Sequence, residues 1–338
     1  FPALRTFYLP FDFSWLAEKA LHRLRPTALM LVELELWPNL LAAAYRRHIP
    51  VLVANGRIMP RSAKAYRFLK TLFPRFARAM AAATYCAQNE EYAQRLQALG
   101  VPRSRTHIAG NVKFDGLRTA ADSQRLRSLV EAFAIRAEDR VLVAGSTWPG
   151  EERILLNVYK ELRQQFDNLR LVLVPRHIER AGEVEKQIED AGFKCYRRTS
   201  LSSEAVGANG LRQGVVLVDT VGELATVYAL ATCVFVGKSL VPLGGQNMME
   251  PAALGKPVLF GPHTFNFKRE VELLLRHEAA QVVGTEQELL QGLKALLSDS
   301  ERAAHMARRA QKVIVTNQGA TGRHMEVLKK VLESAHGG

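Results

Sequence analysis

Short apolar runs rich in β-branched residues alternate with longer amphipathic stretches along most of the chain. The apolar runs predict strands, and the stretches between them, with apolar residues three and four positions apart, predict helices. The predicted strands are 28–32, 51–54, 140–144, 171–174, 215–218, 233–236 and 257–260. The predicted helices are 38–47, 151–164, 179–191, 223–231 and 248–254. Because the strands are apolar almost throughout, the pattern predicts an α/β fold whose parallel sheets carry helices on both faces.

This alternation is interrupted between residues 114 and 140, where a polar, helix-prone segment carries no strand pattern. We therefore predict two Rossmann-like, doubly wound domains, over residues 1–118 and 119–320. The first would hold few strand–helix repeats, so we expect it to be incomplete, with residues missing ahead of Phe1. The last segment, 321–338, is amphipathic and is expected to pack on the first domain as a helix.

Positive charge is concentrated in the first domain. The chain has 46 Lys and Arg residues against 33 Asp and Glu, a net charge of +13, and no acidic residue lies between Glu35 and Glu90. Segment 61–80 interleaves bases with aromatic and aliphatic residues, which suits an anionic membrane surface or a phosphorylated lipid, and equally an ordinary surface helix. Pro74 is expected to kink or end that helix. The basic residues assigned to this surface are Arg57, Arg61, Lys64, Arg67 and Lys70.

Several classes of protein are disfavoured by what the sequence lacks. No uninterrupted apolar run reaches the roughly 18 residues that a bilayer crossing needs. Cys86, Cys195 and Cys233 lie far apart and form no motif with metal-ligand spacing, so we expect no metal site, no disulfide and a reducing cytosolic setting. Neither GxGxxG nor a nucleic-acid-binding motif is present, so the charge predicts no specific nucleic-acid partner.

Four loops in the second half follow predicted strands and carry glycines or polar residues. They are AGSTWPGEE at 144–152, VPRH at 174–177, DTVGEL at 219–224 and PLGGQNMMEP at 242–251. Each loop alone also fits an ordinary strand-to-helix turn. Because parallel strands end at one edge of a sheet, however, all four are expected to converge on one crevice, where open α/β sheets bind ligands.

The residue types in these loops suit a sugar nucleotide. The strand-to-helix turn at Gly145, Ser146 and Thr147 exposes backbone N–H groups to an anion, and the two hydroxyls can cap the next helix. Arg176 suits bidentate contact with a phosphate, whereas His177 is more typical of a structural histidine.

The loop near residue 245 is the most informative of the four. Gly244 and Gly245 permit close approach of a ligand to the backbone. The Glu250 carboxylate, in the first turn of the next helix, can accept two ribose hydroxyls.

Two carboxylates and a lysine are the candidate catalytic groups of the first half. Glu33 and Glu35 follow an apolar strand and, two residues apart in extended chain, would lie on one face at a cleft, where they could steady a positive centre or a proton in transfer. Lys113 lies just before the predicted domain boundary and could balance a phosphate leaving group.

Taken in order, the motifs resemble those of the Kdo (3-deoxy-D-manno-octulosonic acid) transferases. The matching segments are VELELWPN at 32–39, NGR at 55–57, GNVK at 110–113, AGST at 144–147, PRH at 175–177, DTVGE at 219–223 and GGQNMMEP at 244–251. The resemblance covers essentially the whole chain.

The resemblance implies a GT-B fold, in which two Rossmann-like domains face each other across a cleft. It implies an inverting transfer of Kdo from CMP-Kdo to the lipid A precursor, at the cytoplasmic face of the bacterial inner membrane, with no metal or cofactor. It also implies roles for individual residues. Glu35 and Lys113, and with less support Glu33, would stabilise the transition state. CMP would contact Pro175, Arg176, Val221, Gly222, Glu223, Asn247, Met248, Met249 and Glu250.

The sequence departs from the family pattern at two points. Leu34 stands where the family has threonine, which leaves open whether Glu33 or Glu35 faces the cleft. The family's general-base glutamate belongs to a glycine-rich loop upstream of the matched region and has no counterpart here. We therefore expect the chain as printed to bind CMP but to transfer poorly.

Two other functions stay open from sequence. One is a different GT-B enzyme that uses a UDP-sugar, such as a UDP-N-acetylglucosamine transferase or epimerase. The other is a basic membrane-surface binding protein without activity, a role that would leave the glycine-rich loop at 244–251 unexplained. The number of Kdo residues transferred and the oligomeric state are not encoded in any motif.

Overall fold

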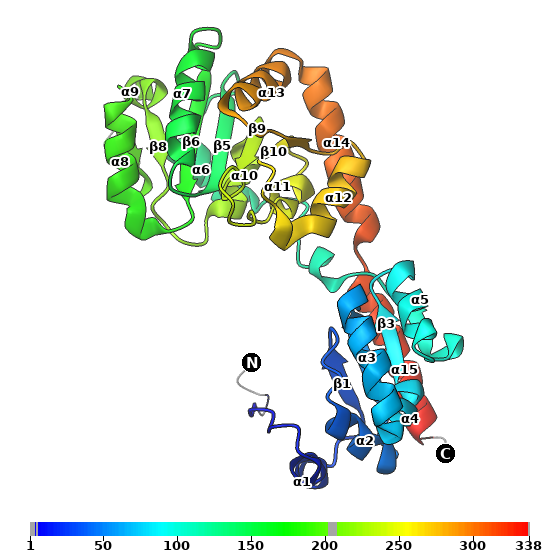
Figure 1. Ribbon diagram of the computed structural model, residues 1–338. Coiled ribbons are helices and arrows are strands. Elements are labelled where there is room, and N and C mark those ends of the chain that lie inside the picture. The colour runs from blue at the N-terminus through cyan, green and yellow to red at the C-terminus, as the bar shows by residue number, and fades with distance from the viewer. Residues whose placement is uncertain (1–3, 5, 202–207, 337–338) are drawn as a thin grey trace. The chain divides into compact units, whose positions relative to one another are not determined.

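The computed structural model describes residues 4, 6–201 and 208–336 and divides the chain into two compact units (Figure 1). Unit 1 comprises Phe1–Gly116 and Asn317–Gly338, and unit 2 comprises Leu117–Thr316. The chain therefore leaves unit 1 after residue 116 and returns to it after residue 316. The boundaries predicted from sequence are residues 118 and 320.

Unit 1 is built on a parallel four-stranded sheet in the order β1-β2-β3-β4. Its strands are β1 (Leu29–Val32), β2 (Val51–Gly56), β3 (Thr84–Ala87) and β4 (Thr106–Ile108). Its helices are α1 (Ser14–Leu24), α2 (Pro38–Arg46), α3 (Pro60–Leu72), α4 (Pro74–Ala82), α5 (Glu90–Ala98) and α15 (Ala320–His336), with 3₁₀ turns η1 (Arg103–Arg105) and η2 (Val112–Phe114).

The two faces of this sheet have separate cores. Apolar residues of α1, α2, α4 and α5 form the larger core with β1, β2 and β3. On the other face, Leu52 and Cys86 pack with Val327 and Leu328 of α15, which lies against β2 and β3 (Figure 1). The carboxyl-terminal helix thus completes the layer that the first 116 residues leave open.

Asn55 and His324 join α15 to the sheet. The Asn55 backbone N–H donates to His324 Nε2 at 2.8 Å, while His324 Nδ1 lies 2.7 Å from the Ala320 carbonyl oxygen. Both side chains are buried. Because Nε2 accepts, the proton of the neutral ring is on Nδ1. Asn55, which sequence analysis treats only as part of the NGR motif, is therefore a structural link between β2 and α15.

Unit 2 has a parallel seven-stranded sheet in the order β11-β10-β9-β5-β6-β8-β7. Its strands are β5 (Arg140–Thr147), β6 (Leu169–Pro175), β7 (Cys195–Arg197), β8 (Val215–Leu217), β9 (Cys233–Val236), β10 (Val258–Phe260) and β11 (Gln281–Val282). Its helices are α6 (Ser123–Ala132), α7 (Glu151–Arg163), α8 (Ala181–Asp190), α9 (Ala208–Gln213), α10 (Leu224–Leu230), α11 (Met249–Ala253), α12 (Lys268–Arg276), α13 (Glu286–Ser298) and α14 (Ser300–Asn317), with 3₁₀ turns η3 (Ile178–Arg180), η4 (Arg198–Ser200) and η5 (Phe265–Phe267).

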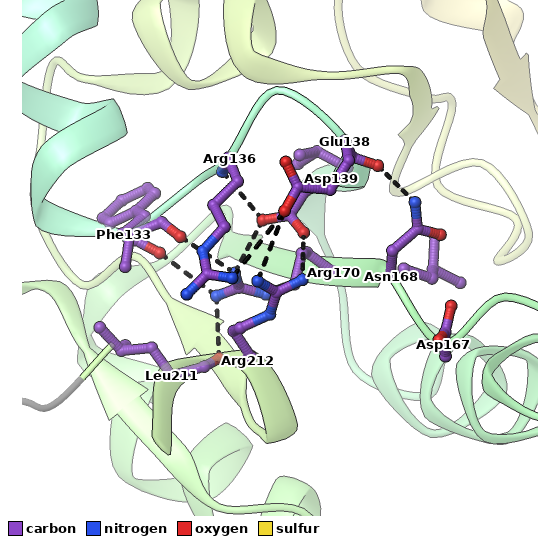
Figure 2. Close-up of polar contacts among 12 residues, drawn as sticks. Phe133, Arg136, Glu138, Asp139, Asp167, Asn168, Arg170, Leu211 and Arg212 are labelled. Atoms are coloured by element: carbon purple, nitrogen blue, oxygen red, sulfur yellow. Dashed lines mark hydrogen bonds and ion pairs between the residues drawn. The ribbon is translucent and has the colours of Figure 1, made fainter. Parts of the chain in front are cut away.

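A polar network closes the amino-terminal edge of this sheet (Figure 2). Asp139, just before β5, pairs with Arg170 of β6 and with Arg212 of α9. Arg170 also donates to the carbonyl oxygens of Phe133 and Leu211. The network ties the start of the sheet to the segment after α6 and to α9 itself.

The predicted α/β fold with parallel sheets is confirmed, and the predicted strand 233–236 is β9 residue for residue. Sequence analysis missed four short strands, namely β3, β4, β7 and β11, which have only two to four residues each. Pro74 ends the basic helix as expected, since α3 stops at Leu72 and α4 begins at Pro74. Among the described residues, no helix has both the length and the apolar character that crossing a membrane requires. The last two residues of the predicted helix 321–338 lie outside the described residues.

Candidate functional site

The strand order of unit 2 places a topological switch point between β5 and β9. β5 pairs with β6 on one side and with β9 on the other, and the chain crosses from one half of the sheet to the other between β8 and β9. Ligands of open α/β sheets bind outside the carboxyl ends of strands at such a point. The loops that follow β5, β6, β8 and β9 all lie at this edge, as their parallel pairing requires.

The loop after β5 is fixed by packing and hydrogen bonds within unit 2. A Cβ on Gly145 would lie 2.2 Å from the Tyr228 hydroxyl oxygen, so this glycine makes room for a buried tyrosine. The Thr147 hydroxyl donates to Glu152 Oε1 at 2.9 Å. Capping of the next helix by Ser146 or Thr147 is wrong, because α7 begins after Gly150 and no side chain caps it.

Glu151 is fully buried at this edge and holds two loops together. Its Oε2 accepts from the backbone N–H groups of Trp148 at 3.0 Å and Lys238 at 2.6 Å, and its Oε1 accepts from those of Ser239 and Leu240 at 2.9 Å each. Burial raises the pKa of Glu151, and the four donors oppose that shift. Sequence analysis did not assign this role, because a glutamate at a helix start is favoured by the helix dipole in any protein.

Arg176 and Glu250, two of the sequence-predicted nucleotide residues, lie within electrostatic range of each other at this edge. Arg176 follows β6 and is exposed, and no hydrogen bond or ion pair joins its guanidinium to any of the described residues. Burial raises the pKa of Glu250, while Asn247 and the positive charge of Arg176 oppose the shift. Asn247 Nδ2 donates to Glu250 Oε1 at 2.9 Å, so the amide orients the carboxylate at the start of α11.

The glycine pair before α11 adopts a backbone that only glycine takes readily. Gly244 and Gly245 have φ of 92° and 76°, in the left-handed region. The N–H of Gly245 donates to the Lys238 carbonyl oxygen at 2.8 Å. A Cβ on Gly244 would lie 2.3 Å from Asn266 Nδ2, so these glycines serve the loop's own packing. Met248 and Met249 are buried beneath it.

Glu223 is less available to a ligand than expected. Its Oε1 accepts from Arg198 Nη2 at 3.2 Å, and Thr220 donates its hydroxyl to Oε2. Gly222 has φ of 89°, and Val221 beside it is 81% exposed. Pro175 is buried as the last residue of β6.

Trp148, His177 and Lys238 form a cluster at the same edge that sequence analysis did not anticipate. The Lys238 ammonium lies 4.9 Å from the centroid of the Trp148 ring, a cation–π distance. The other neighbour of Trp148 is the His177 ring, edge-on at a centroid distance of 5.1 Å. Three loops, after β5, β6 and β9, thus meet through their side chains.

In unit 1, Lys113 pairs with Glu33 rather than with Glu35. Lys113 Nζ lies 3.7 Å from Glu33 Oε1, and both side chains are about half exposed. The expectation that Glu33 and Glu35 share a face in extended chain is wrong, since Glu33 has φ of 62° and begins a turn after β1. Glu35 lies near Tyr66 instead, where its charge adds to the effect of burial in raising the pKa of the tyrosine.

The basic segment forms an exposed surface on α3, none of whose residues is buried. Arg57, Arg61, Lys64 and Arg67 are exposed beside Phe68, Leu72 and Phe73. Lys70 differs from the other bases because its ammonium donates to the Leu99 carbonyl oxygen at the end of α5.

A cavity of about 480 Å³ lies elsewhere in unit 1, between α5, β4 and α15. Its lining includes Arg103, His107 and Lys330 but none of the residues that sequence analysis selects. Among the described residues no group of three or more His, Cys, Asp or Glu side chains could hold a metal ion. Burial raises the pKa of the three free cysteine thiols to about 12.

Comparison with known proteins now identifies the family. Residues 2–116 match the family model described as 3-deoxy-D-manno-octulosonic-acid transferase (kdotransferase). The 3-deoxy-D-manno-octulosonic acid transferase of Haemophilus influenzae is 33% identical over 333 residues, which cover 97% of this chain and 75% of that protein. This chain is a member of the Kdo transferase family. The enzyme of the same name from Bordetella pertussis is 32% identical over 96% of this chain and 74% of its own length.

Solved structures agree with membership of the Kdo transferase family. The C-terminal CMP-Kdo binding domain of WaaA from Acinetobacter baumannii is 28% identical, with a TM-score of 0.51, over 56% of this chain and 96% of its own. UDP-GlcNAc 2-epimerase from Neisseria meningitidis, 16% identical, has a TM-score of 0.58 over 95% of this chain and 80% of its own. The second likeness shows the fold alone, and this chain has a GT-B fold.

Proposed function

We propose that this protein transfers Kdo from CMP-Kdo to the lipid A precursor in lipopolysaccharide assembly, with inversion at the anomeric carbon. The observation that carries the proposal is that Arg176, which has no ion-pair partner among the described residues, lies within electrostatic range of the half-buried Glu250, whose carboxylate Asn247 orients, at the switch-point edge of unit 2. The relatives named as Kdo transferases and the CMP-Kdo binding domain similar to this chain support the choice of donor.

In this proposal unit 2 binds the nucleotide. The Arg176 guanidinium contacts the phosphate, for which its planar donors are suited. Glu250 accepts the ribose hydroxyls, and Val221 to Glu223 and Asn247 to Met249 complete the pocket wall. The turn at Gly145 to Thr147 and the loop at Gly244 and Gly245 shape its floor. No metal or cofactor enters the reaction.

Unit 1 provides the acceptor side of the reaction. A base takes the proton of the acceptor hydroxyl, the oxygen bonds to the anomeric carbon of Kdo, and the bond from that carbon to the phosphate oxygen breaks to release CMP. Lys113 balances charge on the departing phosphate, while Glu35, and with less support Glu33, stabilise positive charge that develops on the sugar. Because Glu33 pairs with Lys113, it also holds that ammonium in position.

The acceptor is a phosphorylated, acylated disaccharide at the anionic cytoplasmic face of the inner membrane. The exposed bases of α3 and its neighbour Arg57 attract phosphate, and the exposed Phe68 and Leu72 suit acyl chains. Lys70 contributes less, because the Leu99 carbonyl oxygen already accepts from it. No specific nucleic acid is involved.

Calorimetric titration with CMP, UMP and UDP tests the donor assignment. We expect selective CMP binding that Arg176→Ala and Glu250→Ala each weaken at least about tenfold, the loss of one charge-assisted contact. Arg153→Ala and Glu161→Ala, exposed positions on α7, serve as matched controls. Preference for UMP or UDP would assign the chain to a UDP-sugar enzyme instead, and no nucleotide binding by the folded protein would overturn the proposal.

A further inference from the structure

Lys238 has a backbone conformation that non-glycine residues rarely adopt. Its φ is 58°, and it comes directly after Gly237 at the carboxyl end of β9. The conformation is fixed from both sides, because its N–H donates to the buried Glu151 at 2.6 Å and its carbonyl oxygen accepts from Gly245 at 2.8 Å. Residues in such strained conformations persist where the surroundings over-determine them, and they cluster at functional sites.

The Lys238 side chain lies against an aromatic ring. Its ammonium lies 4.9 Å from the Trp148 ring centroid, and Trp148 is itself supported by His177. This contact favours one direction for the flexible lysine stem, at the cost of side-chain entropy that a freely solvated lysine would keep.

This confined cation lacks a counter-ion. No carboxylate within the described ranges lies at ion-pair distance from the Lys238 ammonium. Glu151 accepts from the Lys238 backbone N–H, but each of its carboxylate oxygens already accepts from two backbone N–H groups. The side chain is only partly exposed, so an anion that reached it would be screened less by water than at an open surface.

The position of Lys238 complements that of Arg176. β5 lies between β6 and β9, so Arg176 follows the strand on one side of β5 and Lys238 follows the strand on the other. The donor of the proposed reaction has two anionic groups, the phosphate and the carboxylate of the sugar acid. Two unpaired cations at the end of one sheet match two anions on one ligand.

We propose that Lys238 binds an anionic group of the donor, either the phosphate or the Kdo carboxylate, and that Trp148 holds the lysine ammonium in place for that contact. The inference rests on the proposed function, since it takes the CMP-Kdo donor as the ligand of unit 2. It adds to the nucleotide site a donor-binding residue that lies outside the motifs of the family resemblance.

Cytidine, CMP and CMP-Kdo together identify the group that Lys238 binds. If it is the phosphate, Lys238→Met weakens CMP and CMP-Kdo binding about tenfold and leaves cytidine binding unchanged. If it is the carboxylate, only CMP-Kdo binding weakens. In either case Lys238→Arg retains most of the affinity, and Trp148→Leu weakens the same ligands as Lys238→Met.

Two further variants separate the loss of the Lys238 charge from indirect effects. Lys238→Gly removes the side chain but accepts the left-handed φ, so it separates loss of charge from a disturbed loop. It should reproduce the ligand pattern of Lys238→Met, while Lys160→Met, on the exposed side of α7, should bind all three ligands as wild type does.

The possible failures are distinguishable. Unchanged affinities for all three ligands in Lys238→Gly, or losses that include cytidine equally, would overturn the role of Lys238 while leaving the donor assignment intact. Absence of CMP and CMP-Kdo binding by the wild-type protein would overturn the proposed function and this inference together.

Discussion

Asp139 and Arg170 form a buried ion pair, with Asp139 Oδ2 3.3 Å from Arg170 Nη1 and almost no exposed surface on either side chain (Figure 2). Asp139 also pairs with Arg212 at 3.0 Å and accepts from the Arg136 backbone N–H at 2.9 Å. Partners on several segments offset the desolvation that burying two charges costs. The pair lies at the amino-terminal edge of the sheet, opposite the edge to which we assign the nucleotide.

Asp139→Asn is therefore expected to affect stability and not ligand binding. Removing one charge of a buried pair leaves the other uncompensated, which typically costs about 3–5 kcal/mol. Gly145 to Thr147 are the last residues of β5, and at about 3.3 Å per residue they lie about 20 to 26 Å along the strand from Asp139. Urea unfolding should show the loss, and CMP affinity measured on the folded fraction should stay within about twofold of wild type.

The neighbouring Glu138 gives a matched control. Its side chain is exposed and its ion pairs with Arg136 and Arg212 are long, at 3.9 and 3.7 Å. Glu138→Gln should cost less than about 1 kcal/mol, as surface ion pairs do. Equal losses of stability in Asp139→Asn and Glu138→Gln would mean that burial of the Asp139–Arg170 pair does not determine how much it stabilises the fold.

Glu151 and Glu152 are adjacent buried glutamates with separable roles. Glu152 accepts from Arg180 at 2.8 Å and from Thr147, whereas Glu151 fixes the backbone of Lys238 to Leu240. We expect Glu151→Gln and Glu152→Gln each to destabilise unit 2 by about 3 kcal/mol, because each leaves buried donors without an anionic acceptor. Only Glu151→Gln should also weaken CMP-Kdo binding, by about tenfold or more, since only it releases the Lys238 loop.

Thermal unfolding and donor titration, run on the same samples, check this separation. If Glu152→Gln weakened CMP-Kdo binding as much as Glu151→Gln does, the loss of stability alone would account for the loss of affinity.

Features that local pattern determines are predictable from this sequence, whereas those that depend on distant contacts are not. β9 and the loops that end in Arg176 and Glu250 follow from apolar runs and from the rule that parallel strands end at one edge. The role of Glu151 rests on hydrogen bonds to a segment 87 to 89 residues away, for which no spacing along the chain gives a signal.

The error at Glu33 and Glu35 has a different cause. The interpretation assumed that extended chain continues past Val32, but Glu33 takes a left-handed φ and the alternation of faces ends there. Few non-glycine residues adopt that region, so sequence propensity argues against the conformation that occurs. The structural role of Asn55 and His324 gives no signal in sequence for the same reason as that of Glu151, because the two residues are 269 positions apart.

CMP affinity should depend on pH through Glu250. Burial raises the pKa of Glu250 above its ordinary value of 4.5, and the ionised carboxylate is the form that accepts ribose hydroxyls. Affinity is therefore highest above this raised pKa and falls as the pH is lowered through it. Calorimetry across the acidic and neutral range should show this decline.

The phosphate of CMP also takes up a proton, near about pH 6, so a control is needed. Glu250→Gln keeps the phosphate titration and removes that of the carboxylate. The decline in affinity should be steeper in the wild-type protein than in Glu250→Gln, and superimposable profiles would exclude Glu250 as an ionised ligand to the ribose.

His324→Leu should loosen the attachment of α15 in unit 1. The substitution leaves the buried Asn55 N–H without its acceptor, which costs about 1–3 kcal/mol. Amide hydrogen exchange should speed up in β2 and α15 and stay unchanged in the sheet of unit 2. His305→Leu, an exposed histidine on α14, should stay within about 0.5 kcal/mol of wild type. Unaltered exchange in β2 would contradict the linking role of His324.

Membrane binding should depend on the apolar residues of α3 as well as on its bases. Phe68 and Leu72 are more than half exposed on a helix with no buried residue, so replacing both by serine costs the free protein little. Because each side chain would lose apolar contact with acyl chains, binding of Phe68→Ser/Leu72→Ser to vesicles that contain anionic lipid should fall about tenfold or more. Phe265→Ser, an equally exposed aromatic position in unit 2, should bind as wild type does.

Co-sedimentation with anionic and with neutral vesicles separates the apolar contribution from the electrostatic one, since neutral vesicles retain only the apolar one. Equal binding of the double variant and wild type to anionic vesicles would leave the basic residues alone responsible and would remove α3 as an inserting surface.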